Sequence, residues 1–345
     1  MSFPASDRRD TADFWSKCLN VIEQARSRGT DLSVVMPYES RPDDRNEATL
    51  FLKPELTADK NVNLAAVLEL LQKSLAKHKV DVEGAAVLSG PFLASHNIMP
   101  RHYGAINKAS REGINSLTPL AHKRLQSAFS NPLAAGAEVL GGHQFLNKYP
   151  FFTPKSLSVL WDCKSATSVK LAPGTYAADF RVFDRQVVIV NGFNPYQIEY
   201  YTEAGKAIFA LIVRTKTPWS TLRRDLIGAT DPTQAAAGSI RQKLLAGKRK
   251  WRIREVDRSL NGVHLSAGPI EGYFEIRRFF QSFGDVEECA NFLRAYTSAG
   301  LDEGKLDSLS SNPLVGNGND KMPLFDATEE MNMTDAITFL HKKRR

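Results

Sequence analysis

A histidine and a glutamate, set in two different local contexts, are the residues of this sequence whose types and spacing most directly indicate chemistry. His264 ends the apolar stretch "NGVHLS", and Glu275 lies eleven residues further on, in a segment that reads as a helix. A lone histidine at a strand end is usually a packed or hydrogen-bonded structural residue. A chemical role requires other polar residues, from distant parts of the chain, around the same imidazole.

The elements that must position these residues alternate between strands and helices. Apolar runs predict strands at 48–54, 84–93 and 206–215, and a strand end at 261–266. Residues 62–78 carry leucines and a valine along one helical face, which predicts a helix, and Pro269 suits the first position of another. Within 105–200, two runs around Asp184 predict a β-hairpin. Residues 1–45 begin with an amphipathic helical pattern, and beyond about residue 300 the composition predicts a loose segment with a short helix at 333–342.

Short motifs along this order carry a family resemblance. They are "LFLKPE", "RHY", "RRDLIGATDP", "AAGSIR" and "NGVHLS", followed by Glu275. In this order they resemble the nucleoside diphosphate kinases. The resemblance implies a ferredoxin-like βαββαβ antiparallel sheet with helices on its faces. Here that α/β (α+β) domain would span 46–300, enlarged by an N-terminal helical extension (1–45), a central α/β insertion (about 105–200) and a C-terminal extension (301–345).

The resemblance also implies an activity, the transfer of the γ-phosphoryl group of ATP or another NTP to an NDP through a phosphohistidine. His264 would be the nucleophile, since imidazole is neutral and nucleophilic near pH 7. Glu275 would orient its ring. Mg²⁺ would be held through the nucleotide's phosphates, with no dedicated metal ligands. The residues implied to bind nucleotide and phosphate are Lys53, Tyr103, Phe152, Arg224, Thr230, Arg241, Asn261 and Ser266.

The sequence departs from the family pattern in three places. The family has glycine, serine and aspartate after the histidine, whereas this chain has Leu265, Ser266 and Ala267. The insertion at about 105–200 is much longer than the family needs. It contains "KYPFF", which resembles the aromatic pair on which the family stacks the base and which implies Phe152 as the stacking ring. About ten extra residues between Arg241 and Asn261 include the basic run "GKRKWRIR". Such insertions would admit a different acceptor or partner, or block the oligomers typical of the family.

Composition is that of a globular protein, with 42% hydrophobic and 24% charged residues. No apolar run approaches the roughly 20 residues of a membrane span, and the N-terminal stretch has no apolar core of a signal peptide. Cys18, Cys163 and Cys289 are odd in number and widely spaced, which favours a reducing compartment. We therefore expect a cytoplasmic protein without a membrane partner.

Three functional alternatives follow from these observations. The first is the phosphotransferase, acting on an NDP or on a different acceptor. The second is a nucleotide-binding regulatory or interaction protein on the same fold, which Leu265 and Ala267 favour and which the retention of both His264 and Glu275 opposes. The third is nucleic-acid binding by the basic run and the formal charge of +7, although such runs are more often solvated faces. A homo-oligomer remains open in each case.

Overall fold

The computed structural model describes residues 12–28, 31–38, 43–164, 167–283, 286, 290–316 and 321–343. The chain forms two compact units. Unit 1 comprises residues 1–92 and 204–345, and unit 2 comprises residues 93–203. Cys289 lies outside the described residues. None of the helices in the described ranges is long and apolar enough to cross a membrane.

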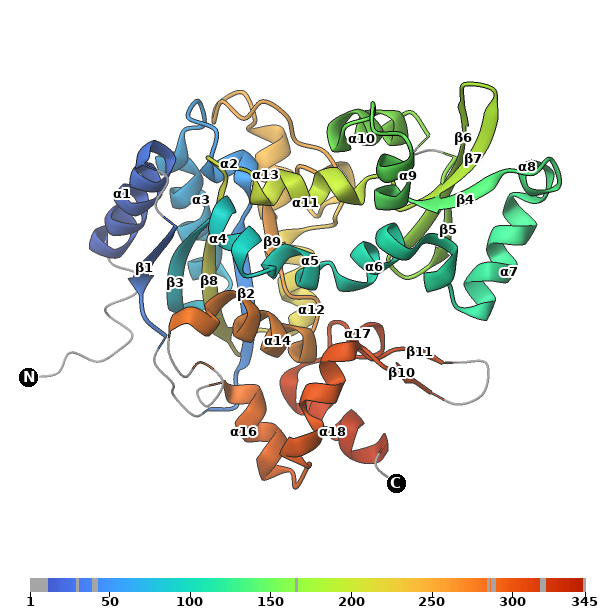
Figure 1. Ribbon diagram of the computed structural model, residues 1–345. Coiled ribbons are helices and arrows are strands. Elements are labelled where there is room, and N and C mark those ends of the chain that lie inside the picture. Colours follow the sequence, from blue (N-terminus) through green and yellow to red (C-terminus); the bar gives the residue numbers. More distant parts are fainter. Residues whose placement is uncertain are drawn as a thin grey trace, which may run out of the picture. The chain divides into compact units, whose positions relative to one another are not determined.

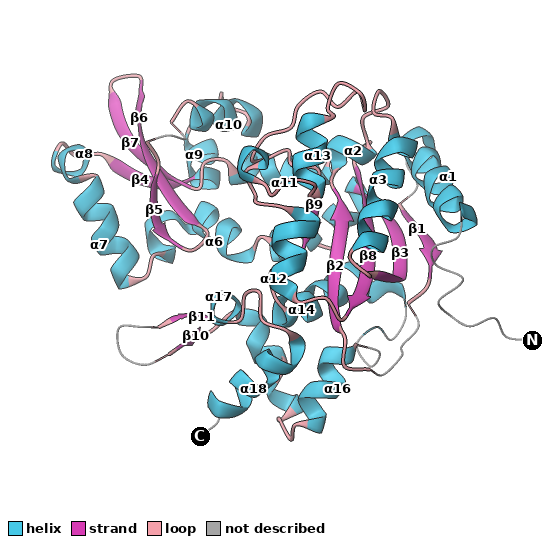
Figure 2. Ribbon diagram, turned by 180° about the vertical axis from the view of Figure 1, so that it is seen from behind, coloured by secondary structure: helices cyan, strands magenta, loops and turns pink. Residues whose placement is uncertain are grey.

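Unit 1 is built on a five-stranded sheet with the order β1-β3-β8-β2-β9, in which every neighbouring pair is antiparallel (Figures 1 and 2). The strands are β1 (Leu32–Met36), β2 (Asn46–Leu52), β3 (Asp81–Ser89), β8 (Ala207–Thr215) and β9 (Val263–Leu265). All residues of β2 and β8 are buried, because helices cover both faces of the sheet. The predicted strands at 48–54, 84–93 and 206–215 are therefore confirmed, with shifts of a few residues at their ends.

The helices of unit 1 divide between the two faces of this sheet. On one face lie α1 (Ala12–Arg28), α3 (Leu64–Lys77) and α13 (Ile240–Ala246), whose apolar residues share a core with Leu50, Leu52 and Phe209. On the other, α14 (Pro269–Phe280) packs on β2, with Phe279 against Phe51. The connections contain α2 (Pro54–Thr57), α12 (Trp219–Thr221), η3 (Leu222–Ile227), η4 (Pro232–Gln234) and η5 (Gln281–Phe283).

The C-terminal part of unit 1 is packed, in place of the loose segment that its composition predicts. Its elements are α16 (Asn291–Ser298), η6 (Glu303–Lys305), η7 (Asp307–Ser311), β10 (Leu314–Val315), β11 (Met322–Pro323), α17 (Leu324–Ala327) and α18 (Met333–Lys343). Leu301, Leu324 and Ile337 form a core with Ile270 and Phe274 of α14. These apolar residues are separated by polar stretches, so no local pattern reveals them. The predicted helix at 333–342 is confirmed as α18.

Unit 2 has its own four-stranded sheet, in the order β4-β7-β6-β5. The strands are β4 (Glu138–Gly141), β5 (Val169–Ala172), β6 (Thr175–Val182) and β7 (Arg185–Val190). β6 and β7 form the hairpin predicted around Asp184, and β4 lies parallel to β7. The surrounding helices are α4 (Gly90–Ser95, at the boundary between the units), α5 (Ile98–His102), α6 (Gly104–Glu112), η2 (Gly113–Ser116), α7 (Pro119–Ala128), α8 (Ser130–Ala134), α9 (Gly142–Lys148), α10 (Pro154–Asp162) and α11 (Asn194–Thr202).

A half-buried imidazole makes the stability of unit 2 dependent on pH. Burial, together with the nearby charge of Arg111, lowers the pKa of His143 from 6.5 to about 4, and its Nδ1 lies 2.9 Å from Ser110 Oγ. Between pH 4 and pH 6.5 the His143 imidazole is therefore protonated in most unfolded chains and neutral in most folded ones. We expect the free energy of unfolding to fall by up to about 3 kcal/mol as the pH drops from 7 to 4. Urea denaturation at a series of pH values measures this slope. His143→Asn, which keeps a polar group towards Ser110, should flatten it, and an unchanged slope would contradict the assignment.

Candidate functional site

His264 lies on the edge strand β9, with its ring against the neighbouring strand. β9 pairs with β2 in the register that places His264 opposite Phe51. The two rings stack with their centroids 4.5 Å apart and their planes 19° apart. The His264 side chain is 19% exposed, so the imidazole is held on one side and accessible in part. Local sequence produces this position, because the short apolar stretch "VHL" completes the sheet beside the buried strand β2.

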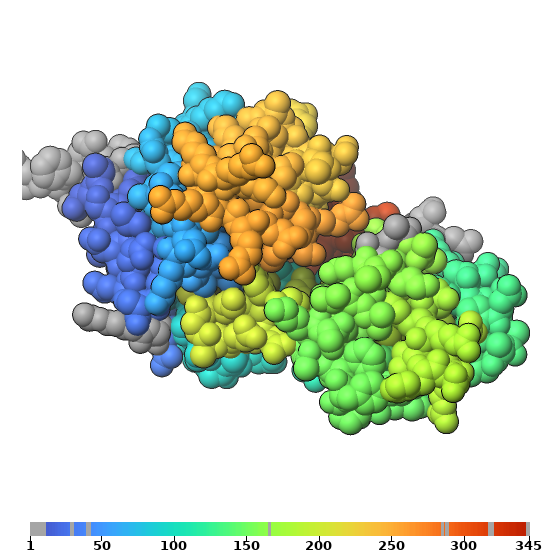
Figure 3. All heavy atoms as spheres, turned by 90° about the horizontal axis from the view of Figure 1, so that it is seen from above, coloured from blue at the N-terminus to red at the C-terminus, as the bar shows by residue number. Residues whose placement is uncertain are grey.

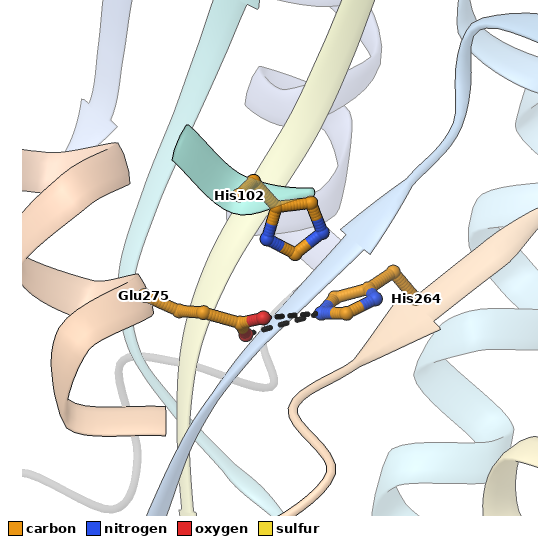
Figure 4. Close-up of side chains that lie close together, drawn as sticks. All are labelled: His102, His264 and Glu275. Atoms are coloured by element: carbon orange, nitrogen blue, oxygen red, sulfur yellow. Dashed lines mark hydrogen bonds and ion pairs between the residues drawn. The ribbon is translucent and has the colours of Figure 1, made fainter. Parts of the chain in front are cut away.

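Glu275 comes from α14 and meets the His264 ring at its Nε2 atom. Both carboxylate oxygens lie 3.0 Å from Nε2, and Figure 4 shows the carboxylate pointing at the ring. The Glu275 side chain is fully buried. An ionised carboxylate only accepts hydrogen bonds, so Nε2 is the donor in this contact, and in a neutral imidazole the lone pair is then on Nδ1. The contact expected from the sequence is therefore present, and it selects the tautomer with a nucleophilic Nδ1.

Ser266 is a buried link between the carboxylate and the sheet. Its hydroxyl donates to Glu275 Oε2 at 2.5 Å and accepts the backbone N–H of Thr49 at 3.0 Å. The residue is fully buried, so its hydroxyl orients Glu275 in this structure. The family resemblance implied that Ser266 contacts the nucleotide. In the structure its hydroxyl bonds to the Glu275 carboxylate and orients it.

Lys53, Arg241 and Asn261 gather at the opposite end of β9, where the strand begins. Lys53 Nζ donates to Ser259 O at 2.9 Å, and Arg241 donates to Gly228 O and Val263 O at 2.8 and 2.9 Å. Asn261 Nδ2 donates to the backbone oxygens of Thr230 and Arg258. These three candidates are brought together in a buried setting, and backbone carbonyls accept from each of them.

Burial shifts the pKa values of Lys53 and of the nearby Glu55. It lowers the pKa of the Lys53 ammonium, with the nearby Arg241 acting in the same direction and the nearby Glu55 carboxylate opposing it. Burial also raises the pKa of Glu55, whose Oε1 accepts the Gly262 N–H at 2.8 Å. Glu55 Oε2 and Asn261 Oδ1 are buried without a hydrogen-bond partner among the described residues. A buried polar atom without a partner is unusual in a folded protein, and a bound water or ligand group would satisfy it.

The side chains of Arg223 and Arg224, neighbours in η3, point in different directions. Arg224, the candidate from the sequence, is 71% exposed and pairs with Asp225. Arg223 instead directs its guanidinium to Leu265 O, at 3.4 Å, next to His264. Thr230 is exposed, and its backbone oxygen accepts from Asn261. The arginine beside the His264 strand is therefore Arg223, which the motif comparison did not select.

Tyr103 and Phe152, the remaining candidates, belong to unit 2. Tyr103 is partly buried at the end of α5, and its hydroxyl donates to Tyr201 Oη at 3.3 Å. Phe152 is partly buried and packs against the core of that unit, with its ring centroid 5.1 Å from that of Phe145, while the adjacent Phe151 is 60% exposed. Phe151 is therefore the more accessible aromatic ring of the "KYPFF" stretch.

The basic run lies on the surface of unit 1, on the face shown in Figure 3, where residues around 250 are gold to orange. Arg249, Lys250, Arg252 and Arg254 are exposed, while Trp251 and Ile253 between them are buried. The side chains of these four cations make no hydrogen bond or ion pair within the part of the chain that the structure describes, although the Arg252 N–H donates to Arg249 O at 3.2 Å. The alternation gives a packed loop with a charged outer face.

Comparison with known proteins does not extend these observations, because no protein-family model and no curated protein matches the chain. The chemical reading therefore depends on the site itself. A histidine whose Nε2 donates to a buried carboxylate, and whose Nδ1 carries a lone pair, is arranged as an oriented nucleophile or base.

Proposed function

We propose that this chain is a nucleoside diphosphate kinase-like phosphotransferase that works through a phosphohistidine on His264. The observation that carries the proposal is the series of contacts from Ser266 through Glu275 to His264. It is the nucleophile and orienting-carboxylate pair that a phosphoryl-carrying histidine requires. The proposal includes a ferredoxin-like βαββαβ core. In its support, β2, α3 and β3, then β8, α13 and β9, follow in that order, with a β3-β8-β2-β9 sheet.

In the proposed first half-reaction, Nδ1 of His264 attacks the γ-phosphorus of an NTP. An N–P bond forms as the bond to the bridging oxygen breaks, and the NDP leaves with that electron pair. Glu275 keeps the proton on Nε2 and stabilises the positive charge that develops on the ring. In the second half-reaction an oxygen of an acceptor NDP attacks the phosphohistidine and regenerates neutral His264. Atoms and charge balance without a further reactant.

The buried cations suit a polyanionic ligand. Lys53 and Arg241 lie together beside Asn261, and positively charged donors stabilise the charge spread over phosphoryl oxygens. Asn261 Oδ1 lacks a hydrogen-bond partner among the described residues and suits a sugar hydroxyl as donor. Mg²⁺, carried by the nucleotide's phosphates, would neutralise part of their charge. The ligands would be nucleotides of the cytoplasm, and the phosphoryl acceptor an NDP or a different acceptor molecule.

A second candidate function is a nucleotide-binding regulatory protein with little kinase activity. The observation that favours it is that Lys53 and Arg241 already donate to backbone carbonyls, while Arg224 pairs with Asp225. Cations in such bonds have fewer donors left for phosphate. The two functions differ in one property, which is whether the histidine becomes phosphorylated.

Incubation of the purified protein with γ-³²P-ATP and Mg²⁺ distinguishes the kinase from the regulatory protein. We expect acid-labile, alkali-stable label on the wild type and none on His264→Gln, which retains a polar side chain of similar length. His122→Gln, at a partly buried position of α7 in unit 2, serves as the matched control and should label like the wild type. Removal of the label by an added NDP supports the NDP acceptor, and label that NDP does not remove points to another acceptor. Wild-type protein that binds nucleotide without labelling would contradict the kinase and support the regulatory protein.

A further inference from the structure

The turn that follows His264 on β9, residues 265–267, is held from several sides. Arg223 donates to Leu265 O, and Trp219 Nε1 donates to Ser266 O at 2.9 Å. Ala267 O accepts the N–H of Glu330 at 2.9 Å. This turn leads from the nucleophile to α14, so its position sets the distance between His264 and Glu275. Here the sequence departs from the glycine, serine and aspartate of the family it resembles.

Part of the support comes from a segment more than sixty residues away, which we call the C-terminal turn (residues 328–332, between α17 and α18). Glu330 in this turn has a φ of 60°, in the left-handed region that long side chains rarely adopt. Its N–H makes the bond to Ala267 O in this conformation. A strained residue that persists must be held by its surroundings, and such strain is concentrated at functional sites.

The contact between the two turns is too close for a side chain. A Cβ added to Gly268 would lie 2.7 Å from Thr328 O, well inside contact distance. Thr328 is almost fully buried, and its hydroxyl donates to Leu324 O at 2.9 Å, so the carbonyl has little room to retreat. Gly268 therefore lets the backbone of the C-terminal turn approach the start of α14.

The C-terminal turn also contacts the two residues that support residues 265 and 266, the side chain of Arg223 and the backbone of Trp219. Glu329 pairs with Arg223 at 3.2 Å, and Arg223 is the donor to Leu265 O. Asn332 Oδ1 accepts the N–H of Trp219 at 3.1 Å and the amide of Asn46 at 2.9 Å. Asn46 Oδ1 accepts the Met333 N–H at 2.8 Å and completes the link to β2.

From these contacts we infer that the C-terminal turn is a positioning element for His264. It holds residues 265–267 through Glu330, Arg223 and Trp219, and it supplies the support that the family's glycine-serine-aspartate turn would otherwise give. The inference rests on the proposed function for its effect on rate, because a displaced nucleophile slows phosphoryl transfer while the phosphate-binding residues stay in place. Its structural part, the orientation of the His264 ring, does not depend on any activity.

Two variants displace the turn by different means. Gly268→Ala forces a methyl group against Thr328 O, and Asn332→Ala removes the acceptor shared by Trp219 and Asn46. Gly304→Ala is the matched control, because Gly304 also lies in the C-terminal part, and there the nearest atom to an added Cβ is a carboxylate oxygen of Asp302 at 3.3 Å. We expect both test variants to lower the rate of His264 labelling roughly 10- to 100-fold with nucleotide affinity unchanged. Gly304→Ala should label at the wild-type rate.

The ring ¹⁵N chemical shifts of His264, assigned by their loss in His264→Gln, provide the readout that needs no activity. We expect a protonated Nε2 in the wild type and in Gly304→Ala, and a mixture of tautomers in Gly268→Ala and Asn332→Ala. Wild-type shifts and wild-type labelling in both test variants would overturn the inference. If the wild-type protein does not label, the proposed function fails. The ring shifts alone then decide the positioning role.

Discussion

Glu275→Gln is expected to lower the rate of His264 phosphorylation roughly 10²- to 10⁴-fold without unfolding the protein. Glutamine has the shape of glutamate, so packing around the buried side chain is kept. The Ser266 hydroxyl, now bonded to Glu275 Oε2, would take the single amide oxygen as its acceptor. The amide NH₂ would then face Nε2 of His264 as a donor, and the ring proton would move to Nδ1. The atom that carries the lone pair in the proposed mechanism would thereby be blocked.

Rapid-quench measurement of acid-labile label gives this rate directly. The matched control is Glu69→Gln, because Glu69 is exposed on α3 and pairs with Lys73 one helical turn further on. It should label at the wild-type rate. Glu275→Ala, whose side chain has no hydrogen-bond donor to place against Nε2, should lose less of the rate than Glu275→Gln. Labelling of Glu275→Gln at the wild-type rate would contradict the orienting role.

Glu47→Ala is expected to destabilise unit 1 by about 3–5 kcal/mol, because it removes the closest partner of a buried charge. The Arg214 side chain is fully buried, and its Nη2 lies 2.7 Å from Glu47 Oε1. The same carboxylate accepts the Tyr38 hydroxyl at 2.6 Å and the Asn291 N–H at 3.0 Å. Burial and the adjacent Glu47 raise the pKa of Tyr38, so the phenol stays a donor at neutral pH. A single substitution thus breaks bonds to Tyr38, which follows β1, to Arg214 of β8 and to Asn291 of α16.

Urea denaturation monitored by circular dichroism measures this loss. The double variant Glu47→Ala with Arg214→Met should recover part of the stability, since it no longer buries an arginine beside a missing carboxylate. Lys73→Ala, which breaks an exposed pair on α3, should leave the midpoint unchanged. A Glu47→Ala midpoint equal to that of the wild type would show that the network carries little stability.

Local patterns were sufficient to predict most elements that carry the site. β8 begins with seven apolar residues, β2 ends in Leu50, Phe51 and Leu52, and α3 has an apolar face, so the hydrophobic pattern predicts each of them. The meeting of His264 and Glu275 also follows locally. A short strand, a tight turn and a helix beginning at Pro269 return the first turns of α14 to the strand. These predictions needed no information from distant parts of the chain.

Long-range contacts and side-chain directions could not be predicted from local sequence patterns. The bond between Glu330 and Ala267 joins distant segments, and no periodic pattern marks it. The choice between Arg223 and Arg224 depends on η3, whose wider π-type turn changes the direction of successive side chains. The burial of Lys53 and Arg241 against backbone carbonyls is likewise set by the packing of β9 rather than by residue type.

The most direct test of the central claim locates the transferred phosphoryl group. Wild-type protein would be incubated with ATP and Mg²⁺, digested at neutral to alkaline pH, and its peptides sequenced by mass spectrometry under conditions that preserve phosphohistidine. We expect a phosphoryl group on His264 of the wild type. It should be lost from that peptide when an acceptor is added, and absent from His264→Gln. A phosphoryl group on another residue, or none on a protein that binds ATP, would contradict it.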